Sequence, residues 1–377
     1  MFAVAALFVA SSEESATAQQ VWSVGEPTLR IGNQTPEHEF HLVSSLLVRG
    51  GRIYVADRSQ RIRAYDATTG DLISAGGGSG QGPGEFNFLE WLDDCAGDEL
   101  FAADAVLDRV SVFSPDLEHI RTFRIGNSGT VMSVRCAGPD RLVALSQYEG
   151  TDFTKIRPGP YRMSVQLSLF ASEDGRLLST FGRYPGEDRY RESSNDGPWQ
   201  WGIKPLLESL REGFIFGTGE GWWLTRHDTA GAVLDSLAIN EQRRPISGSD
   251  IEADIQEHLE LQERYYGRSQ AFLAARRQFL EAYEYPEYYP AYSAILASDA
   301  GFVWVQEYPY VGQRSSHWKV FSPEGDHIGN AEMPAGFEMM WVGDTHVAGI
   351  KRNEIDVAFV EIRPLQRRAP DIGSLPG

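Results

Sequence analysis

The sequence of 377 residues predicts an all-β fold built from a repeated four-stranded unit, and three observations lead to this prediction. Gly (38 residues) and aromatic residues (11%) are frequent, which is typical of many short strands joined by turns. Strand-like runs recur 47 positions apart, from Ile53 to Leu100. A Gly- and Pro-containing junction, AGGGSGQGPGEF, indicates a repeated fold because weaker echoes of it recur. The junction spans residues 75–86 and its echoes span residues 29–40, 123–131 and 181–187.

The first two units are the most regular and define the repeat. Their spacing is close to the size of a four-stranded propeller blade, which predicts a β-propeller. The later units are longer but keep the same order of strands and turns. The predicted strands are residues 42–48, 52–57, 61–65 and 71–75 in the first unit, and residues 88–93, 99–104, 109–113 and 119–125 in the second.

Four further units bring the predicted number of blades to six. The sixth unit lacks a fourth strand, and residues 28–31, which precede the first complete unit, would supply it. An N-terminal strand would thus close the ring and leave no unpaired edge between the chain ends. The sequence therefore predicts a six-bladed β-propeller of four-stranded antiparallel blades. The first strands assigned to the four further units begin near residues 131, 214, 294 and 339.

One segment, residues 240–292, departs from β character. Ser249 is a candidate N-cap for a helix that begins near Asp250, with Ile251, Ile255 and Leu259 at helical spacing. Gly267 would end this helix, and a second apolar stripe follows. The sequence predicts a helical hairpin, at about residues 248–285, inserted between blades 4 and 5. Packing on the propeller rim is one interpretation of its apolar stripe, and a lid or partner-docking element is another.

The first residues of the chain indicate an exported protein, and its charge disfavours one class of partner. Residues 1–18 combine a short apolar stretch with an A-x-A-like site and are predicted to be the remnant of a signal peptide. Residues 19–367 would form the propeller, and residues 368–377 a flexible tail. We expect an extracytoplasmic location, periplasmic or secreted, without a membrane span. A net charge of −19 makes nucleic acid an unfavourable partner.

The two cysteines, Cys95 and Cys136, lie in similar contexts of neighbouring units, DDCAGD and VRCAGP. Neither has the spacing of a metal site. Two interpretations stay open: one disulfide if the chain is exported, or two small buried thiols.

The strand and junction sequences resemble those of the NHL-like six-bladed β-propellers of bacteria. The resemblance rests on the IYVAD sequence of residues 53–57, the RIRAYD sequence of residues 61–66 and the GSGQGPGEF sequence of residues 78–86. It implies the fold. It implies no activity, because this architecture serves binding modules and enzymes alike.

Every long insertion falls on one face of the predicted ring, the face that carries the junctions and the loops between second and third strands. We call it the long-loop face, and the opposite one the short-loop face. Loops of this length are usually functional or disordered. The candidate ligand-binding residues are therefore polar and aromatic residues of these segments, although packing of the loops on one another stays an alternative. They are His38, His41, Tyr148, Tyr161, Trp199, Trp201, Tyr288, Tyr289, Tyr308, Tyr310 and Arg314.

Catalytic motifs are absent from the sequence. It contains no paired metal-binding histidines, no nucleophile elbow and no Walker loop, and Asp57 and Asp104 are expected to fix turns. We therefore expect a non-enzymatic binding or scaffold protein, without a cofactor, for a small molecule, carbohydrate, peptide or protein. The alternative is a metal-dependent hydrolase, lactonase-like or lyase-like, with a divalent metal at the mouth of the central channel.

Overall fold

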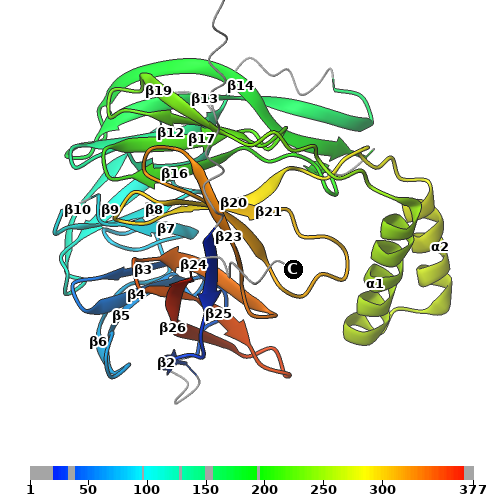
Figure 1. Cartoon of the computed structure of the whole chain (residues 1–377), viewed down its shortest axis with the longest axis horizontal. Helices are drawn as coiled ribbons and strands as arrows, with labels where there is room; N and C mark the ends of the chain where they lie inside the picture. The colour runs from blue at the N-terminus through cyan, green and yellow to red at the C-terminus, as the bar shows by residue number, and fades with distance from the viewer. Residues whose placement is uncertain are drawn as a thin grey trace, which may run out of the picture.

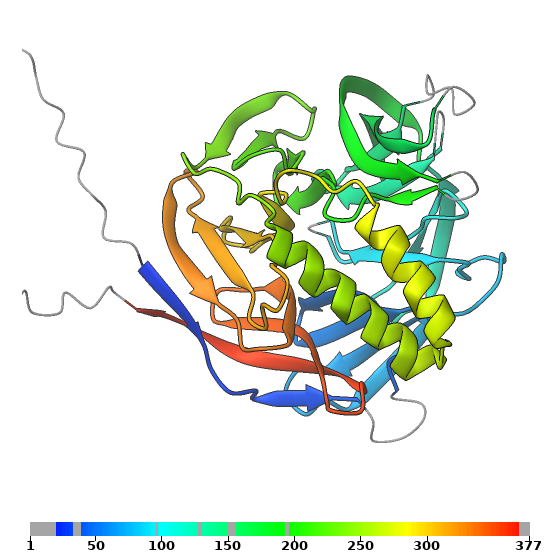
Figure 2. The ribbon, with the colours of Figure 1, turned by 90° about the vertical axis from the view of Figure 1, so that its right-hand side faces the viewer.

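The computed structural model describes residues 20–32, 39–95, 97–126, 130–148, 156–192 and 196–368. Its sheets are arranged around a central axis, as in a β-propeller (Figure 1). Seen along this axis, the chain runs round the ring in sequence order (Figure 2). The predicted all-β class is correct, with two helices added.

Four blades are separate sheets, and each follows the chain from its innermost to its outermost strand. The first blade consists of β3 (Val43–Arg49), β4 (Arg52–Asp57), β5 (Arg61–Asp66) and β6 (Leu72–Gly77). The second consists of β7 (Leu89–Asp93), β8 (Leu100–Asp104), β9 (Arg109–Phe113) and β10 (His119–Arg124). The third consists of β11 (Val131–Cys136), β12 (Arg141–Gln147), β13 (Gly159–Ala171), β14 (Leu177–Arg191) and β15 (Asp196–Pro198). The fourth consists of β16 (Leu206–Leu210), β17 (Gly213–Gly217), β18 (Trp223–His227) and β19 (Val233–Ala238).

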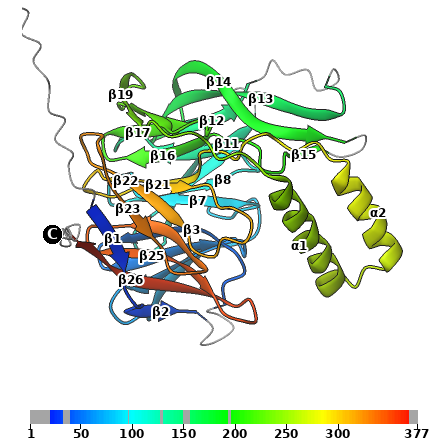
Figure 3. The same cartoon turned by 45° about the vertical axis from the view of Figure 1, so that its right-hand side comes forward.

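The prediction of six separate blades is wrong, because the remaining strands form one nine-stranded sheet, which we call the closing sheet. Its member β1 pairs with β23 in parallel and with β26 in antiparallel orientation, and so joins two units that were expected to be independent (Figure 3). The ring thus has four blades and one large sheet. The closing sheet consists of β20 (Tyr292–Ala297), β21 (Val303–Glu307), β22 (His317–Phe321), β23 (His327–Glu332), β24 (Phe337–Val342), β25 (His346–Arg352), β26 (Ala358–Arg368), β1 (Gln20–Val24) and β2 (Leu29–Ile31).

The length of β26 explains why the last strands form one closing sheet instead of two separate blades. The first residues of β26 pair with β2, and its last residues extend to pair with β1. Trp22 of β1 is buried against Trp304, with ring centroids 5.2 Å apart. The N-terminal segment does close the ring, but through two strands rather than one.

The core of the molecule lies between neighbouring sheets. Both faces of the second and third strands of the regular blades are buried, which is why β4 reads as a nearly continuous apolar run rather than an alternating one. Tyr54 and Ile62 of the first blade pack with Leu92 and Leu100 of the second. Similar clusters fill the space between the other neighbours. Each sheet is therefore stabilised by the two beside it.

Asp57 and Asp104 fix turns, as predicted. One carboxylate oxygen of Asp57 accepts a hydrogen bond from the backbone N–H of Ser59, 2.9 Å, and the other accepts from that of His41, 3.0 Å. Asp104 does the same in the second blade, for the N–H two residues after it and for that of Asn87. Each aspartate thus joins a turn to the segment that enters its blade.

The junction at residues 75–86 connects the first two blades. Phe86 is fully buried, and Arg109 of the second blade donates hydrogen bonds to the carbonyl oxygens of Gln81, Gly82 and Glu85. One of its echoes behaves differently: residues 181–187 lie inside the 15-residue strand β14, because β13 is long enough to pair with them. That echo is not a turn.

The predicted helical hairpin is formed by α1 (Gly248–Tyr266) and α2 (Gln270–Glu281). The N-cap of α1 is Ser247 rather than Ser249, and it forms a capping box with Asp250. Gly267, in the left-handed region at φ 55°, ends α1. The hairpin stands on the long-loop side of the ring, in front of its centre (Figures 1 and 2).

No helix in the described part of the chain is long and apolar enough to cross a membrane. The predicted signal segment lies outside the described residues, as does the tail beyond residue 368. The domain boundaries stay predictions.

Candidate functional site

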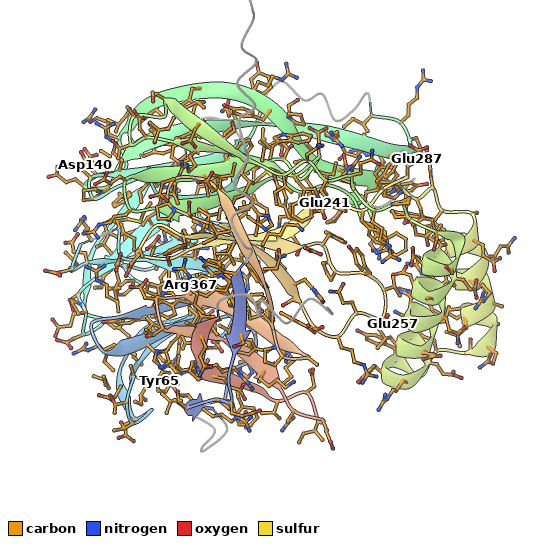
Figure 4. The ribbon with its side chains drawn as sticks, viewed as in Figure 1. Tyr65, Asp140, Glu241, Glu257, Glu287 and Arg367 are labelled. Atoms are coloured by element: carbon orange, nitrogen blue, oxygen red, sulfur yellow. A yellow bond between two sulfur atoms is a disulfide. The ribbon has the colours of Figure 1, made fainter. Side chains whose placement is uncertain are left out.

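The two faces of the ring are clearly separated in space. Figure 4 shows Asp140, on a short connection, at one end of the ring, and Glu257 and Glu287 at the other end, at the hairpin; Glu241 lies between them. The predicted site residues belong to segments of the long-loop face.

One cluster combines four of the predicted residues with Tyr285. We call it the aromatic cluster, and its members are Trp201, Tyr285, Tyr289, Tyr308 and Tyr310. Sequence analysis had not selected Tyr285. Ring centroids lie 5.3 Å apart for Trp201 and Tyr285, 5.2 Å for Trp201 and Tyr289, and 5.7 Å for Tyr289 and Tyr310. Tyr289 is only 1% exposed. The cluster packs the insertions on one another, which is the alternative left open by the sequence.

The polar atoms of the aromatic cluster are enclosed as well. Burial raises the pKa of Tyr285 and of Tyr289 to about 12, so both stay neutral at physiological pH. The Arg244 guanidinium lies 4.0 Å from the ring centroid of Tyr310. Burial also raises the pKa of Asp254 on α1, whose carboxylate accepts a hydrogen bond from Gln200, 2.9 Å. These contacts hold α1 to the ring.

Three other predicted residues fasten the insertions. The Tyr161 hydroxyl donates to Asp196, 2.8 Å, within the extended β13–β15 hairpin. The Trp199 indole N–H donates to the carbonyl oxygen of Glu284, 2.7 Å, at the end of the helical hairpin. Tyr148 lies under the guanidinium of Arg183, 4.4 Å from its ring centroid. Their contacts are structural.

The remaining predicted residues lie on the surface or outside the described part. His38 lies outside the described residues. His41 and Arg314 are exposed, and Tyr288 is 40% exposed, with the Arg243 guanidinium 5.3 Å from its ring centroid. No hydrogen bond or ring contact described in the structure joins these three to one another.

Sequence analysis missed the most exposed aromatic residues, at the turn between the two helices. We call this set the hairpin tip: Leu261, Tyr265, Tyr266, Arg268 and Phe272. Tyr265 is 66% exposed and Tyr266 is 64% exposed. The Arg268 guanidinium stacks on Tyr266 and Phe272, 5.8 and 5.2 Å from their ring centroids. Leu261 and Tyr265 lie off the Ile251, Ile255, Leu259 stripe, which was a signal that the sequence contained, whereas Tyr266 falls on that stripe.

The ring carries further exposed apolar residues on the same face. Leu42, Phe88, Val106 and Ile355 lie in junctions or in loops between second and third strands, and Trp223 is the first residue of the third strand β18. Exposed aliphatic residues elsewhere are spread around the rim, at the start of outer strands such as β6 and β19. Exposed aromatic residues are thus a property of the long-loop face.

A second feature is the central channel, a cavity of about 710 Å³. It is lined by the innermost strand of each blade together with β20 and β24 of the closing sheet. Cys95 and Cys136 form a disulfide in its wall and so join the second and third blades, which decides between the two interpretations of these cysteines. Sequence analysis named none of the charged residues of this wall as site residues.

The metal-dependent alternative finds no support in the described residues. Among them, no group of three or more His, Cys, Asp or Glu side chains could hold a metal ion. His227 illustrates the usual role of a single histidine: it stacks on Phe214 at 4.6 Å, and burial lowers its pKa.

Comparison with known proteins bears on the fold. No protein-family model matches the chain, and no curated protein matches it. It is similar to the solved structure of a Bacteroides fragilis protein that is predicted to be exported, with a TM-score of 0.52 and 11% identity over 92% of this chain and 99% of that one. It is also similar to a member of the DUF4221 family from Bacteroides vulgatus, with a TM-score of 0.54 and 10% identity over 94% and 99% of the two chains. This likeness shows the fold alone. At this level of sequence identity, a shared fold does not indicate a shared activity.

Proposed function

We propose that this chain is an exported, non-enzymatic binding protein that docks a polypeptide partner on the hairpin tip and the surrounding long-loop face. The observation that carries the proposal is the exposure of Tyr265 and Tyr266, next to Arg268, on an insertion that projects from the ring. Tyr and Arg are enriched at the centres of protein interfaces.

The geometry favours a polypeptide over a small molecule or carbohydrate. The aromatic cluster is closed by its own contacts and leaves its rings little free surface. The exposed apolar residues are instead spread over the tip and over several loops of the ring. A wide surface of this kind suits a partner that buries a large area. Tyr288, His41 and Arg314 are then peripheral contacts of the docked partner.

Export is part of the proposal. The disulfide between Cys95 and Cys136 favours an oxidising compartment, periplasmic or extracellular. The described part of the chain has no membrane-spanning helix, and one protein of similar fold is predicted to be exported.

The test is site-specific photo-crosslinking in the producing cells. A crosslinking amino acid replaces Phe272 at the tip or, as a matched control, Ile73 on the rim, since both are exposed. We expect a discrete protein adduct from position 272 that disappears when Tyr265→Ser and Tyr266→Ser are added, and no such adduct from position 73.

Three results would overturn the proposal. These are equal adducts from both positions, no adduct from position 272, and an adduct that persists in the double variant. Binding of the purified protein to vesicles of anionic phospholipid, lost in the double variant and without a protein adduct, would assign the tip to a membrane surface instead.

A further inference from the structure

The wall of the central channel carries an excess of negative charge. Its residues include six carboxylates against three guanidinium groups, so the formal excess is three negative charges. A narrow passage with low-dielectric walls focuses such a field. The carboxylates are Glu90, Asp93, Asp94, Glu208, Asp299 and Glu338, and the guanidinium groups are Arg49, Arg135 and Arg211.

Two of these carboxylates are neutralised within the wall. Arg49 forms an ion pair with Asp94, and Arg135 forms one with Glu208, with 3.2 Å between Nε and Oε2. Both pairs link neighbouring sheets, since Arg49 lies on β3 and Glu208 on β16. The four carboxylates outside these pairs, opposed only by Arg211, account for the excess of three negative charges.

Asp93 lies among these groups without a cation. Its carboxylate accepts hydrogen bonds from the Ser209 hydroxyl and from the backbone N–H of Asp94, both at 2.7 Å. No lysine or arginine of the described ranges forms an ion pair with it. The side chain lies deep in the molecule but is still partly accessible, because it faces the channel.

The surroundings of Asp93 make its charge unfavourable. Burial raises the pKa of Asp93 to about 6, and the nearby carboxylates of Asp94 and Glu208 add to this, while the Ser209 hydrogen bond opposes it. Above pH 6 the channel therefore contains an ionised carboxylate that has lost much of its hydration. A bound cation would give this carboxylate a favourable charge interaction in place of the lost hydration.

The backbone supplies further acceptors. Each of the six strands that line the channel lies at an edge of its sheet, where it has only one neighbouring strand. These strands are β3, β7, β11, β16, β20 and β24. An edge strand presents backbone C=O and N–H groups that its sheet does not use. Carbonyl oxygens facing the channel can accept hydrogen bonds from ammonium groups along its length.

We propose that the central channel binds an elongated organic cation of the polyamine class, with one ammonium group on Asp93. Asp93 lies on β7 and Glu338, another carboxylate of the wall, lies on β24; the innermost strand β3 separates β7 from β24, so one compact ion cannot contact both carboxylates. An extended molecule with several ammonium groups can. The volume of about 710 Å³ lies in the range of small-molecule sites.

A metal ion fits the channel less well, because no group of three carboxylate, cysteine or histidine side chains in the described residues could surround one. The proposal is independent of the docking function of the hairpin tip, since the channel wall and the tip share no residue.

Isothermal titration with spermidine tests the proposal. We expect saturable binding at pH 8, weakened about tenfold at pH 5, where a carboxyl with a pKa near 6 is only about one-tenth ionised. Asp93→Asn should weaken binding at least tenfold at pH 8. The matched control is Asp326→Asn, an exposed aspartate on a short loop far from the channel wall, which should bind like the wild type.

The proposal fails if spermidine does not saturate the protein or if Asp93→Asn binds as tightly as the wild type. It also fails if Asp326→Asn weakens binding equally, which would indicate general attraction to an acidic surface. Displacement of spermidine by equimolar Ca²⁺ would indicate a metal site instead. Circular dichroism and thermal unfolding of Asp93→Asn exclude misfolding as the cause, because the amide can keep the Ser209 contact.

Discussion

The short-loop face and the long-loop face are built from opposite ends of the same strands, yet they satisfy their polar groups differently. Short turns close on themselves: the Asp228 carboxylate accepts hydrogen bonds from the backbone N–H groups of Ala230 and Ala232, both at 2.8 Å. The long-loop face instead joins segments that are far apart in the sequence, as the Trp199 contact with Glu284 shows. The turns of the short-loop face also accept hydrogen bonds from neighbouring blades, as the Pro115 carbonyl oxygen does from Arg52, 2.6 Å. The contrast is therefore between local turns linked to the next blade on one face and insertions from separate parts of the chain that hold each other on the other.

This difference between the two faces indicates where the fold tolerates insertions and substitutions. Local turns and the disulfide at the short-loop end of the channel fix the ring, so the opposite face can carry insertions without loss of the blades. We expect large effects on stability from the channel wall and small ones from the hairpin. Three predictions, from the largest effect to the smallest, test this contrast.

The largest effect is expected from the disulfide between Cys95 and Cys136. It closes a loop with a sequence separation of 41. Its loss in a Cys95→Ser, Cys136→Ser double variant should lower the free energy of unfolding by about 4 kcal/mol, because the unfolded chain regains the freedom of that loop. Urea unfolding measures the change. Reductant should destabilise the wild type and leave the double variant unchanged, and equal stability of the two proteins would contradict the prediction.

The second effect concerns Asp93 in the absence of any ligand. Its pKa is raised from 3.8 to about 6 on folding, so the folded protein binds this proton more tightly than the unfolded chain does. The contribution of Asp93 to stability therefore falls as the pH rises from about 4 to about 6, by about 3 kcal/mol, and is constant above.

Asp93→Asn removes this titration. The stability of the variant relative to the wild type should rise by about 3 kcal/mol between pH 4 and pH 7. Urea unfolding across this pH range checks it, with Asp326→Asn as the control that should show no such rise. A flat difference for Asp93→Asn would show that the carboxylate is not as poorly hydrated as the channel geometry indicates.

The smallest effect is expected at the start of the helical hairpin. The Ser247 hydroxyl caps α1 by accepting from the backbone N–H of Asp250, 3.2 Å. Ser247→Ala should destabilise α1 by about 1 kcal/mol, whereas Ser249→Ala should have little effect. Hydrogen exchange of the α1 amides measures both variants. The blades should keep their protection, and a loss of protection in the ring would contradict the separation of the two faces.

Much of the ring could be predicted from the sequence, because the first two blades express their structure locally. Buried strands such as RIYVAD and the paired aspartates Asp57 and Asp104 repeat with one period. The count of blades failed where pairing is not local. The pairing of β1 with β23 and β26 depends on contacts between opposite ends of the chain, and a short strand carries no signal of its partner.

The candidate site was predicted less well, since sequence position does not say which side of a loop is covered. Tyr289 and Tyr288 are neighbours in the sequence, yet one is buried in the aromatic cluster and the other is exposed. Asp93 had no signal either, because its role comes from Ser209, which lies on a different blade. Part of the hairpin tip could have been found, because Leu261 and Tyr265 lie outside the apolar stripe of α1.

The position of β1 between β23 and β26 has a consequence for the making of the protein. A chain is synthesised from its N-terminus, and regular blades such as the first can form as soon as their strands have emerged. The strand β1 emerges before all of them, but its two neighbours, β23 and β26, follow all four blades in the sequence. Completion of the ring therefore waits until β26 has been synthesised, and a chain that stops short of residue 365 leaves β1 without its pairing to β26.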